Sequence, residues 1–467
     1  MKAQTIGALR ASGYEVLSIR HELRKNLIDK IRRNEALFPG IIGYEESVIP
    51  AMENAILSGH DIIMLGERGQ GKTRIIRTLI NLLDEEIPVI AGCEINDDPY
   101  HPICRSCRDR VMEFGDSVEI EWLPRERRYA EKLATPDTTI ADLIGEVDPI
   151  KVAEGRYLAD ELTLHYGLIP RTNRGIFAIN ELPDLAERIQ VGLLNIMEER
   201  DVQIRGYKIR LPLDVFVVAT ANPEDYTNRG RIITPLKDRF GAEVRTHYPK
   251  TAELELSIVE QERASIEDGD LRLTVPFFME EIIAEITTLA RRSPDVNQRS
   301  GVSVRVSIAN YETMVANATR RAIRTNEREI VPRASDLPYV ASSTGGKIEL
   351  ESLDENRDST VVDRLIRNAV LNVFNRYFRV QEFEDVVTKF DQGKAVDVSD
   401  ALGSADAMRQ LSDFVPDLRP ALKKIGCDES PATMASGAEF IFEGLHLNKK
   451  LNKDKVAGTT QYRGAIR

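Results

Sequence analysis

A short glycine-rich segment constrains the fold of this chain more than any other feature. It completes the phosphate-binding pattern G-x-x-x-x-G-K-[ST] with Gly66, Glu67, Arg68, Gly69, Gln70, Gly71, Lys72 and Thr73. The apolar run 61–65 before it predicts a buried strand, and residues 74–83 after it are apolar at helical spacing. Glycines let the backbone wrap around phosphates, and the amides at a helix N-terminus supply partial positive charge. We therefore expect a nucleotide site, with Lys72 on the β- and γ-phosphates and Thr73 on Mg²⁺; the alternative is a glycine-rich turn that binds nothing.

The composition describes a globular protein of more than one domain. At 467 residues the chain is too long for one ordinary core. No run approaches the roughly 18 uninterrupted apolar residues of a membrane span, and residues 1–33 lack the apolar centre of a signal peptide, so we expect a cytoplasmic protein with no membrane partner. The net charge of −12 argues against broad binding to nucleic acid. Four cysteines are too few for a disulfide framework.

The order of apolar segments predicts an α/β core followed by helices. Further strands are expected at 175–180 and 215–220, and strands separated by helices imply a parallel sheet with helices on both faces. Later segments are apolar at helical spacing, at 254–266, 276–292, 304–324 and 360–378. We predict four parts: an N-terminal helical segment at 1–37, the P-loop core at 38–249, a helical domain at 250–379, and a helical extension with a mobile basic tail at 380–467.

Polar residues follow the two later strands at the end where a nucleotide is expected. Glu181 can act as the general base that polarises the attacking water. Asn222 can orient the same water through its amide. Arg239 is suited to reach the γ-phosphate held by a neighbouring subunit, although Arg229 and Arg231 compete with it for that role.

In this order and spacing the residues resemble the AAA+ ATPases, and within them the ATPase subunit of magnesium chelatase and its bacterial relatives. The resemblance runs from about Phe38 to Arg305 and includes the segments 38–43, 66–73, 173–175, 221–223 and 238–240. It implies Mg²⁺-dependent ATP hydrolysis by a homo-oligomeric ring, expected to be a hexamer, with 250–379 as the lid. It also implies a partner that carries a von Willebrand A-type domain, and a metal-insertion or remodelling task.

The same resemblance assigns roles to individual residues. Asn222 matches sensor 1, Arg239 the arginine finger, and Arg305 sensor 2, with Arg299 as its competitor. The residues expected to face the adenine are Ile41, Ile42 and Gly43. Two insertions, at about 143–174 and 198–211, look like the family's pore-facing elements, the second with Arg205, Tyr207, Lys208 and Arg210.

One departure from the family pattern bears on turnover. The family carries Asp-Glu at the end of the second strand, whereas this chain has Asn180 before Glu181. An amide accepts hydrogen bonds from Mg²⁺-bound water but brings no charge, and Asp184 follows a proline and is a poor substitute. A working ATPase is the favoured interpretation. The alternatives are a nucleotide-gated scaffold with little turnover, a MoxR-like chaperone, and a nucleic-acid motor, against which the acidic balance weighs.

A cysteine-rich segment offers a second possible site. Cys93, His101, Cys104 and Cys107 read C-x₇-H-x₂-C-x₂-C, a set of four N/S ligands suited to tetrahedral zinc. Cys427 could replace His101 as a ligand. The alternatives are reduced thiols in a polar loop and a redox role for the C-x₂-C pair.

Overall fold

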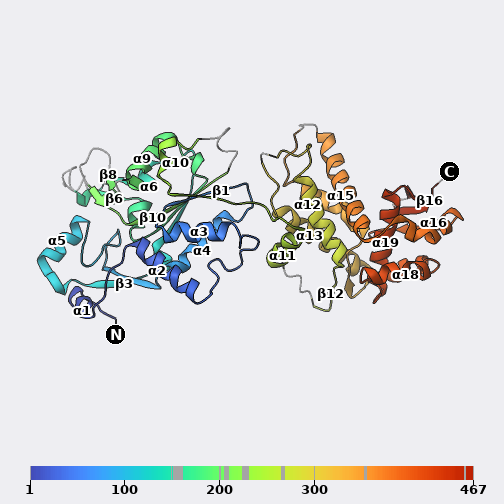
Figure 1. Ribbon diagram of the computed structural model, residues 1–467, viewed down its shortest axis with the longest axis horizontal. Helices are drawn as coiled ribbons and strands as arrows, with labels where there is room; N and C mark the ends of the chain where they lie inside the picture. The colour runs from blue at the N-terminus through green and yellow to red at the C-terminus, as the bar shows by residue number, and fades with distance from the viewer. Residues whose placement is uncertain are drawn as a thin grey trace. The chain divides into compact units, whose positions relative to one another are not determined.

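The computed structural model divides the chain into two compact units, Met1–His247 and Tyr248–Arg467 (Figure 1). It describes residues 2–148, 150, 161–198, 201–203, 210–222, 231–264, 269–298, 300–351, 355–456 and 459–465. For 201–203, 210, 355–359 and 455–456 only the backbone is described.

The first unit is built on a five-stranded sheet in which every neighbouring pair is parallel. In spatial order the strands are β11 (Ala242–Arg245), β1 (Ile62–Leu65), β10 (Val215–Ala221), β7 (Gly175–Asn180) and β4 (Tyr129–Leu133). The three inner strands are fully buried and mainly apolar, and the sequence predicts all three. It does not predict β4 and β11, because these edge strands carry charged side chains such as Glu131 and Glu243 and stay partly exposed.

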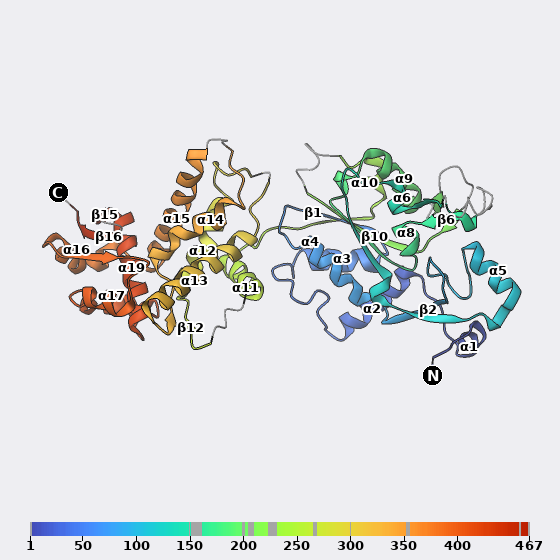
Figure 2. The same ribbon diagram turned by 180° about the vertical axis from the view of Figure 1, so that it is seen from behind.

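Successive side chains of the inner strands point to opposite faces of the sheet and contribute to two hydrophobic cores, one on each face. Helices α2 (Ile19–Arg32), α3 (Val48–Leu57) and α4 (Lys72–Thr78) cover one face (Figure 2). The opposite face packs against α6 (Ile140–Leu143), α8 (Leu168–Arg171), α9 (Glu187–Glu198) and α10 (Thr234–Arg239). Helices on both faces of a parallel sheet confirm the predicted fold class.

Two ion pairs fasten the N-terminal helix α2 to the sheet. Arg128 is fully buried and binds the Glu22 carboxylate at 2.7 Å and 2.5 Å. The Arg20 guanidinium lies 2.7 Å from Asp61 at the start of β1. The predicted N-terminal segment contains α1 (Ile6–Ala11) and α2, and both helices belong to the first unit.

Replacing Arg128 with alanine is expected to destabilise the first unit by about 3–5 kcal/mol, because it leaves the Glu22 charge buried without its partner. Thermal unfolding followed by circular dichroism measures the effect. Arg127→Ala is the matched control, since Arg127 lies in the same turn and is exposed. Equal unfolding midpoints for the two variants would contradict this account of how α2 is held.

The remaining elements of the first unit are pairs of short strands and a surface helix. Antiparallel β2 (Glu86–Ile90) and β3 (Ile120–Pro124) flank α5 (Arg105–Phe114). The predicted insertion at 143–174 contains the antiparallel pair β5 (Gly145–Val147) and β6 (Leu164–Tyr166). The predicted insertion at 198–211 contains the pair β8 (Asp201–Gln203) and β9 (Arg210–Pro212). The predicted pore-facing residues Arg205, Tyr207 and Lys208 lie outside the described residues, as does the side chain of Arg210.

The second unit is mostly helical. Four of its first helices follow the predicted segments: α11 (Ala252–Glu262), α12 (Phe277–Ala290), α13 (Arg305–Thr325) and α15 (Glu355–Tyr377). The short helix α14 (Val340–Gly345) was not predicted. Its later helices are α16 (Glu384–Asp391), α17 (Ser404–Leu411), α18 (Val415–Lys424) and α19 (Pro431–Leu447). A short parallel pair joins β12 (Arg272–Leu273) and β13 (Glu329–Ile330). One hydrophobic core runs through the unit, from α11 to the buried Tyr462 near its end.

The tail that the sequence predicts to be mobile contains two strands, β15 (Leu451–Val456) and β16 (Thr459–Gly464). The two strands pair with each other, and β16 also pairs with β14 (Ala395–Val398). Tyr462 of β16 is buried, and its hydroxyl donates a hydrogen bond to Glu443 of α19. Leu451 and Tyr462 are buried in the core but stand among lysines and polar side chains, which is why composition alone suggests mobility.

In the part of the chain that the structure describes, no helix combines the length and apolarity needed to cross a membrane.

Candidate nucleotide site

The glycine-rich segment forms the loop between β1 and α4. Gly69 and Gly71 have φ of 73° and 74°, in the left-handed region that favours glycine. At Gly66 a Cβ atom would lie 1.8 Å from Thr246 Oγ1 and 2.3 Å from Gln70 Oε1. Glycine is therefore required at Gly66 for packing and at Gly69 and Gly71 for backbone conformation. Helix α4 begins directly after the loop, with Lys72 and the half-buried Thr73 as its first two residues.

Lys72 is buried, and its amine donates hydrogen bonds inside the loop and to the neighbouring strand. The acceptors are the carbonyl oxygens of Gly66 and Glu67, the latter at 2.9 Å, and Asn222 Oδ1 at 2.7 Å. The amine therefore lies at the centre of the loop, where phosphate oxygens can replace these carbonyl acceptors.

Asn222 connects Lys72 to Glu181. While its Oδ1 accepts from Lys72, its Nδ2 donates to Glu181 Oε2 at 2.7 Å. Glu181 has a left-handed backbone, φ 57°, and its N–H donates to Thr220 Oγ1 at 3.0 Å. Non-glycine residues adopt this conformation at a cost, so Thr220 helps to hold it. The structure thus brings together three residues that the sequence predicts for one site.

Asn180, the departure from the family pattern, has a partner that the sequence did not indicate. Its Nδ2 donates to Glu131 Oε1 on the neighbouring strand β4 at 2.6 Å, and its Oδ1 accepts from Thr220 Oγ1 at 3.3 Å. Glu131 also forms a two-point ion pair with Arg77 of α4, at 2.7 Å and 2.9 Å. Arg77 lowers the pKa of the Glu131 carboxyl, which is therefore charged at neutral pH. An aspartate at position 180 would place a second carboxylate against it, so asparagine is the compatible residue.

Asn180→Asp is therefore expected to destabilise the first unit by about 1–3 kcal/mol, since it exchanges a hydrogen bond for repulsion. In the double variant Asn180→Asp, Glu131→Gln, the glutamine amide at position 131 can donate a hydrogen bond to the aspartate at position 180. This variant is expected to recover most of the lost stability. Thermal unfolding of both variants and of Glu131→Gln alone measures the coupling. Additive effects of the two substitutions would show that the two side chains do not depend on each other.

A pocket of about 390 Å³ lies beside the loop. Its lining residues are Leu65, Gly66, Glu67, Gln70, Lys237, Arg245 and Thr246.

The residues predicted to face the adenine, 41–43, are followed by Tyr44, which the sequence analysis did not single out. The buried Tyr44 hydroxyl lies 2.8 Å from the carbonyl oxygens of Gln70 and His247, and burial raises its pKa to about 12. Tyr44 thus ties segment 41–43 to the glycine-rich loop.

The predicted arginines occupy different places. Arg239 ends α10, and its guanidinium lies 2.8 Å from Glu198 and 3.2 Å from Asp238. The competing Arg231 is exposed, and Arg229 lies outside the described residues. Arg305 is exposed at the first position of α13, in the second unit, and its competitor Arg299 lies outside the described residues. The roles of these arginines stay predictions.

The cysteine cluster forms without the predicted histidine. His101 is exposed, and its Nδ1 lies 3.3 Å from Asp98. Asp97 takes its place beside Cys93, Cys104 and Cys107. Cys427 is buried in the core of the second unit.

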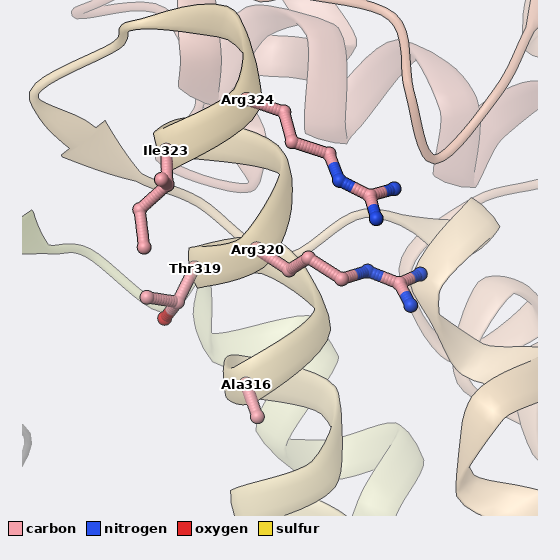
Figure 3. A pocket seen from close by; sticks show the side chains of 5 residues that line it. All are labelled: Ala316, Thr319, Arg320, Ile323 and Arg324. Carbon is pink, nitrogen blue, oxygen red and sulfur yellow. The ribbon is translucent and has the colours of Figure 1, made fainter.

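A further hollow, of about 410 Å³, lies on α13 in the second unit. Its lining residues are Ala316, Thr319, Arg320, Ile323 and Arg324. Figure 3 shows Arg320 and Arg324 extending in the same direction from successive turns of the helix. Arg320 pairs with Asp400 at 2.9 Å and lies over the Tyr339 ring. Its lining includes none of the residues predicted for the nucleotide site.

Comparison with known proteins gives sequence relatives along most of the chain. The magnesium-chelatase subunit ChlI of Nostoc sp. is 31% identical over 373 residues, covering 74% of this chain and 91% of that protein. The same subunit of Anabaena variabilis is 31% identical over 346 residues, covering 69% of this chain and 94% of that protein. The chloroplastic subunit ChlI-2 of Arabidopsis thaliana is 27% identical over 338 residues, covering 68% of this chain and 77% of that protein.

A solved chain from the complex between the BchI and BchD subunits of magnesium chelatase is 19% identical. It covers 67% of this chain and 96% of its own length, with a TM-score of 0.35. No protein-family model matches the chain. The similarity of this chain to known proteins is therefore clearest in its sequence.

Proposed function

The chain belongs to the family of magnesium-chelatase ChlI subunits, and on that premise we propose that it hydrolyses ATP with Mg²⁺ as a subunit of a ring. The proposed ring, a hexamer, drives remodelling of a partner protein or insertion of a metal into it. The partner we propose carries a von Willebrand A-type domain.

The observation that supports hydrolysis is the hydrogen-bonded series Lys72–Asn222–Glu181. Bound ATP with Mg²⁺ supplies the phosphoanhydride bond that is broken. In the proposed mechanism Lys72 and the amides at the start of α4 would bind the phosphates, and Thr73 and Asn180 would hold the magnesium through its bound water or directly. Glu181 accepts a proton from the attacking water at its carboxylate, and the Asn222 amide holds that carboxylate in position.

Completion of the site by a second subunit is the next part of the proposal. Arg239 is held by Glu198 and Asp238 at the surface, and exposed pairs of this kind are worth only about 0–1 kcal/mol. The γ-phosphate of a neighbouring subunit is a stronger competitor for the guanidinium. We assign Arg305 to sensing the nucleotide from the second unit, and residues 41–43 to contacting the adenine.

The second candidate function is a nucleotide-gated scaffold, which Asn180 favours because an amide brings no negative charge to the magnesium site. ATP would then control assembly without turnover.

Steady-state ATP hydrolysis across a range of protein concentrations separates the two. A ring with shared sites predicts that the rate per subunit rises several-fold as subunits assemble, because each site needs a neighbour. ATP binding with no Mg²⁺-dependent turnover at any concentration would favour the scaffold.

A further inference from the structure

Four side chains of metal-ligating type gather away from the nucleotide site. They are Cys93, Asp97, Cys104 and Cys107, and their Sγ and carboxylate atoms all lie within 4.8 Å of one another. Asp97, Cys104 and Cys107 are buried, Cys93 is partly exposed, and all three cysteines are free thiols.

Backbone hydrogen bonds hold the cluster in a form suited to thiolate ligands. The N–H of Asp97 donates to Cys93 Sγ, and the N–H of Cys107 donates to Cys104 Sγ, each at 3.4 Å. Cys104 also caps the N-terminus of α5. These donors stabilise negative charge on sulfur, because hydrogen bonds to the charged form favour it. The two halves of the cluster, 93–97 and 104–107, therefore each present a ligand whose orientation is set by the backbone.

The Asp97 carboxylate gives a second, independent indication. Its Oδ2 accepts from the N–H of Cys104 at 3.0 Å. Its Oδ1 is buried and has no hydrogen-bond partner among the described residues. A buried carboxylate oxygen without a partner is costly, and a cation at the centre of the cluster would satisfy it.

We propose that Cys93, Asp97, Cys104 and Cys107 bind one zinc ion as a structural site. Zinc takes four tetrahedral ligands at about 2.3 Å from sulfur, which places ligand atoms about 3.8 Å apart. Because the ligand atoms lie within 4.8 Å of one another, zinc binding requires them to move closer together by at most about 1 Å. Three thiolates favour zinc over Mg²⁺ or Ca²⁺, which prefer oxygen. Binding releases the thiol protons to solvent, and four protein ligands leave no open position for catalysis.

The position of the cluster indicates what the zinc stabilises. The cysteine loop is fastened to the segment that leads into β7: Asn96 Nδ2 donates to the Arg171 carbonyl at 2.7 Å. Asn173 Nδ2 in turn donates to the Ile95 carbonyl at 3.1 Å. Strand β7 ends in Asn180, next to Glu181. The zinc thus fixes a loop against the strand that carries the proposed general base.

Zinc content of the full-length protein tests the site and does not depend on ATP hydrolysis. Reduced protein, purified without a metal-affinity step, is expected to hold about one zinc per chain by elemental analysis. Asp97→Ala and Cys107→Ser are expected to weaken zinc binding about 100-fold or more, since even groups that only hydrogen-bond to a metal ligand contribute about 10–100-fold. His101→Ala and Cys427→Ser are the matched controls and are expected to keep the zinc.

Cobalt substitution gives a readout of the ligands themselves. Co²⁺ in the wild-type protein is expected to show a tetrahedral ligand-field spectrum with thiolate charge-transfer bands, which weaken in Cys107→Ser. Circular dichroism shows whether each variant folds. If Asp97→Ala does not fold, cobalt spectra of the conservative variant Asp97→Glu, which keeps a carboxylate, test the same ligand position. Zinc-free wild-type protein with three reactive thiols, or a Cys104–Cys107 disulfide in its place, would overturn the proposal. Loss of zinc in His101→Ala with retention in Asp97→Ala would overturn the ligand set.

Discussion

Glu181→Gln is expected to lower the rate of ATP hydrolysis about 10²- to 10⁴-fold, the usual contribution of a general base. The glutamine amide has nearly the shape of the carboxylate and can keep a hydrogen bond to Asn222, which now lies 2.7 Å from Glu181. It cannot accept the proton of the attacking water. Because Lys72 and the glycine-rich loop are unchanged, ATP affinity is expected to stay within a few-fold of the wild type.

Steady-state hydrolysis and equilibrium binding of a fluorescent ATP analogue measure the two quantities separately. Asp184→Asn is the matched control, because Asp184 is an acid in the turn that directly follows Glu181. It is expected to keep near-wild-type turnover. A full rate in Glu181→Gln, or an equal loss in Asp184→Asn, would remove Glu181 from the role of base.

Arg239→Ala is expected to lower turnover about 10³- to 10⁵-fold, the range for an arginine that stabilises the charge on a transferred phosphoryl group. The substitution removes an exposed ion pair with Glu198, so the fold is expected to lose at most about 1 kcal/mol. Rate measurements together with sedimentation distinguish a catalytic loss from a loss of assembly.

Arg231→Ala is the control for Arg239, since Arg231 is an exposed arginine close to it in sequence. We expect it to retain most of the activity. If Arg231→Ala were inactive and Arg239→Ala active, the arginine finger would have to be reassigned.

The sequence predicts the centre of the first unit well because that region obeys strong local rules. The glycine-rich loop has a fixed spacing, and the inner strands 62–65, 175–180 and 215–221 are buried and mainly apolar. Lys72, Glu181 and Asn222 follow from these strands, because the carboxyl ends of parallel strands meet at one edge of a sheet.

The partners of the site residues could not be predicted in the same way. Glu131 lies on an edge strand of mixed polarity, and only the register of β4 against β7 brings it to Asn180. Asp97 is adjacent to another aspartate in the sequence, and only the folded loop selects it over His101 as the neighbour of the cysteines. The strand at 459–464 depends on pairing with β14, far away in the chain. Each of these contacts is non-local and leaves no periodic signal.

Mixing two inactive variants tests most directly whether the site is shared between subunits. Glu181→Gln retains Arg239, and Arg239→Ala retains Glu181, so a mixed ring contains interfaces at which both groups are intact. The account predicts that each variant alone is nearly inactive and that the mixture hydrolyses ATP at a substantial fraction of the wild-type rate. A mixture that assembles and stays inactive would contradict an arginine acting from the neighbouring subunit.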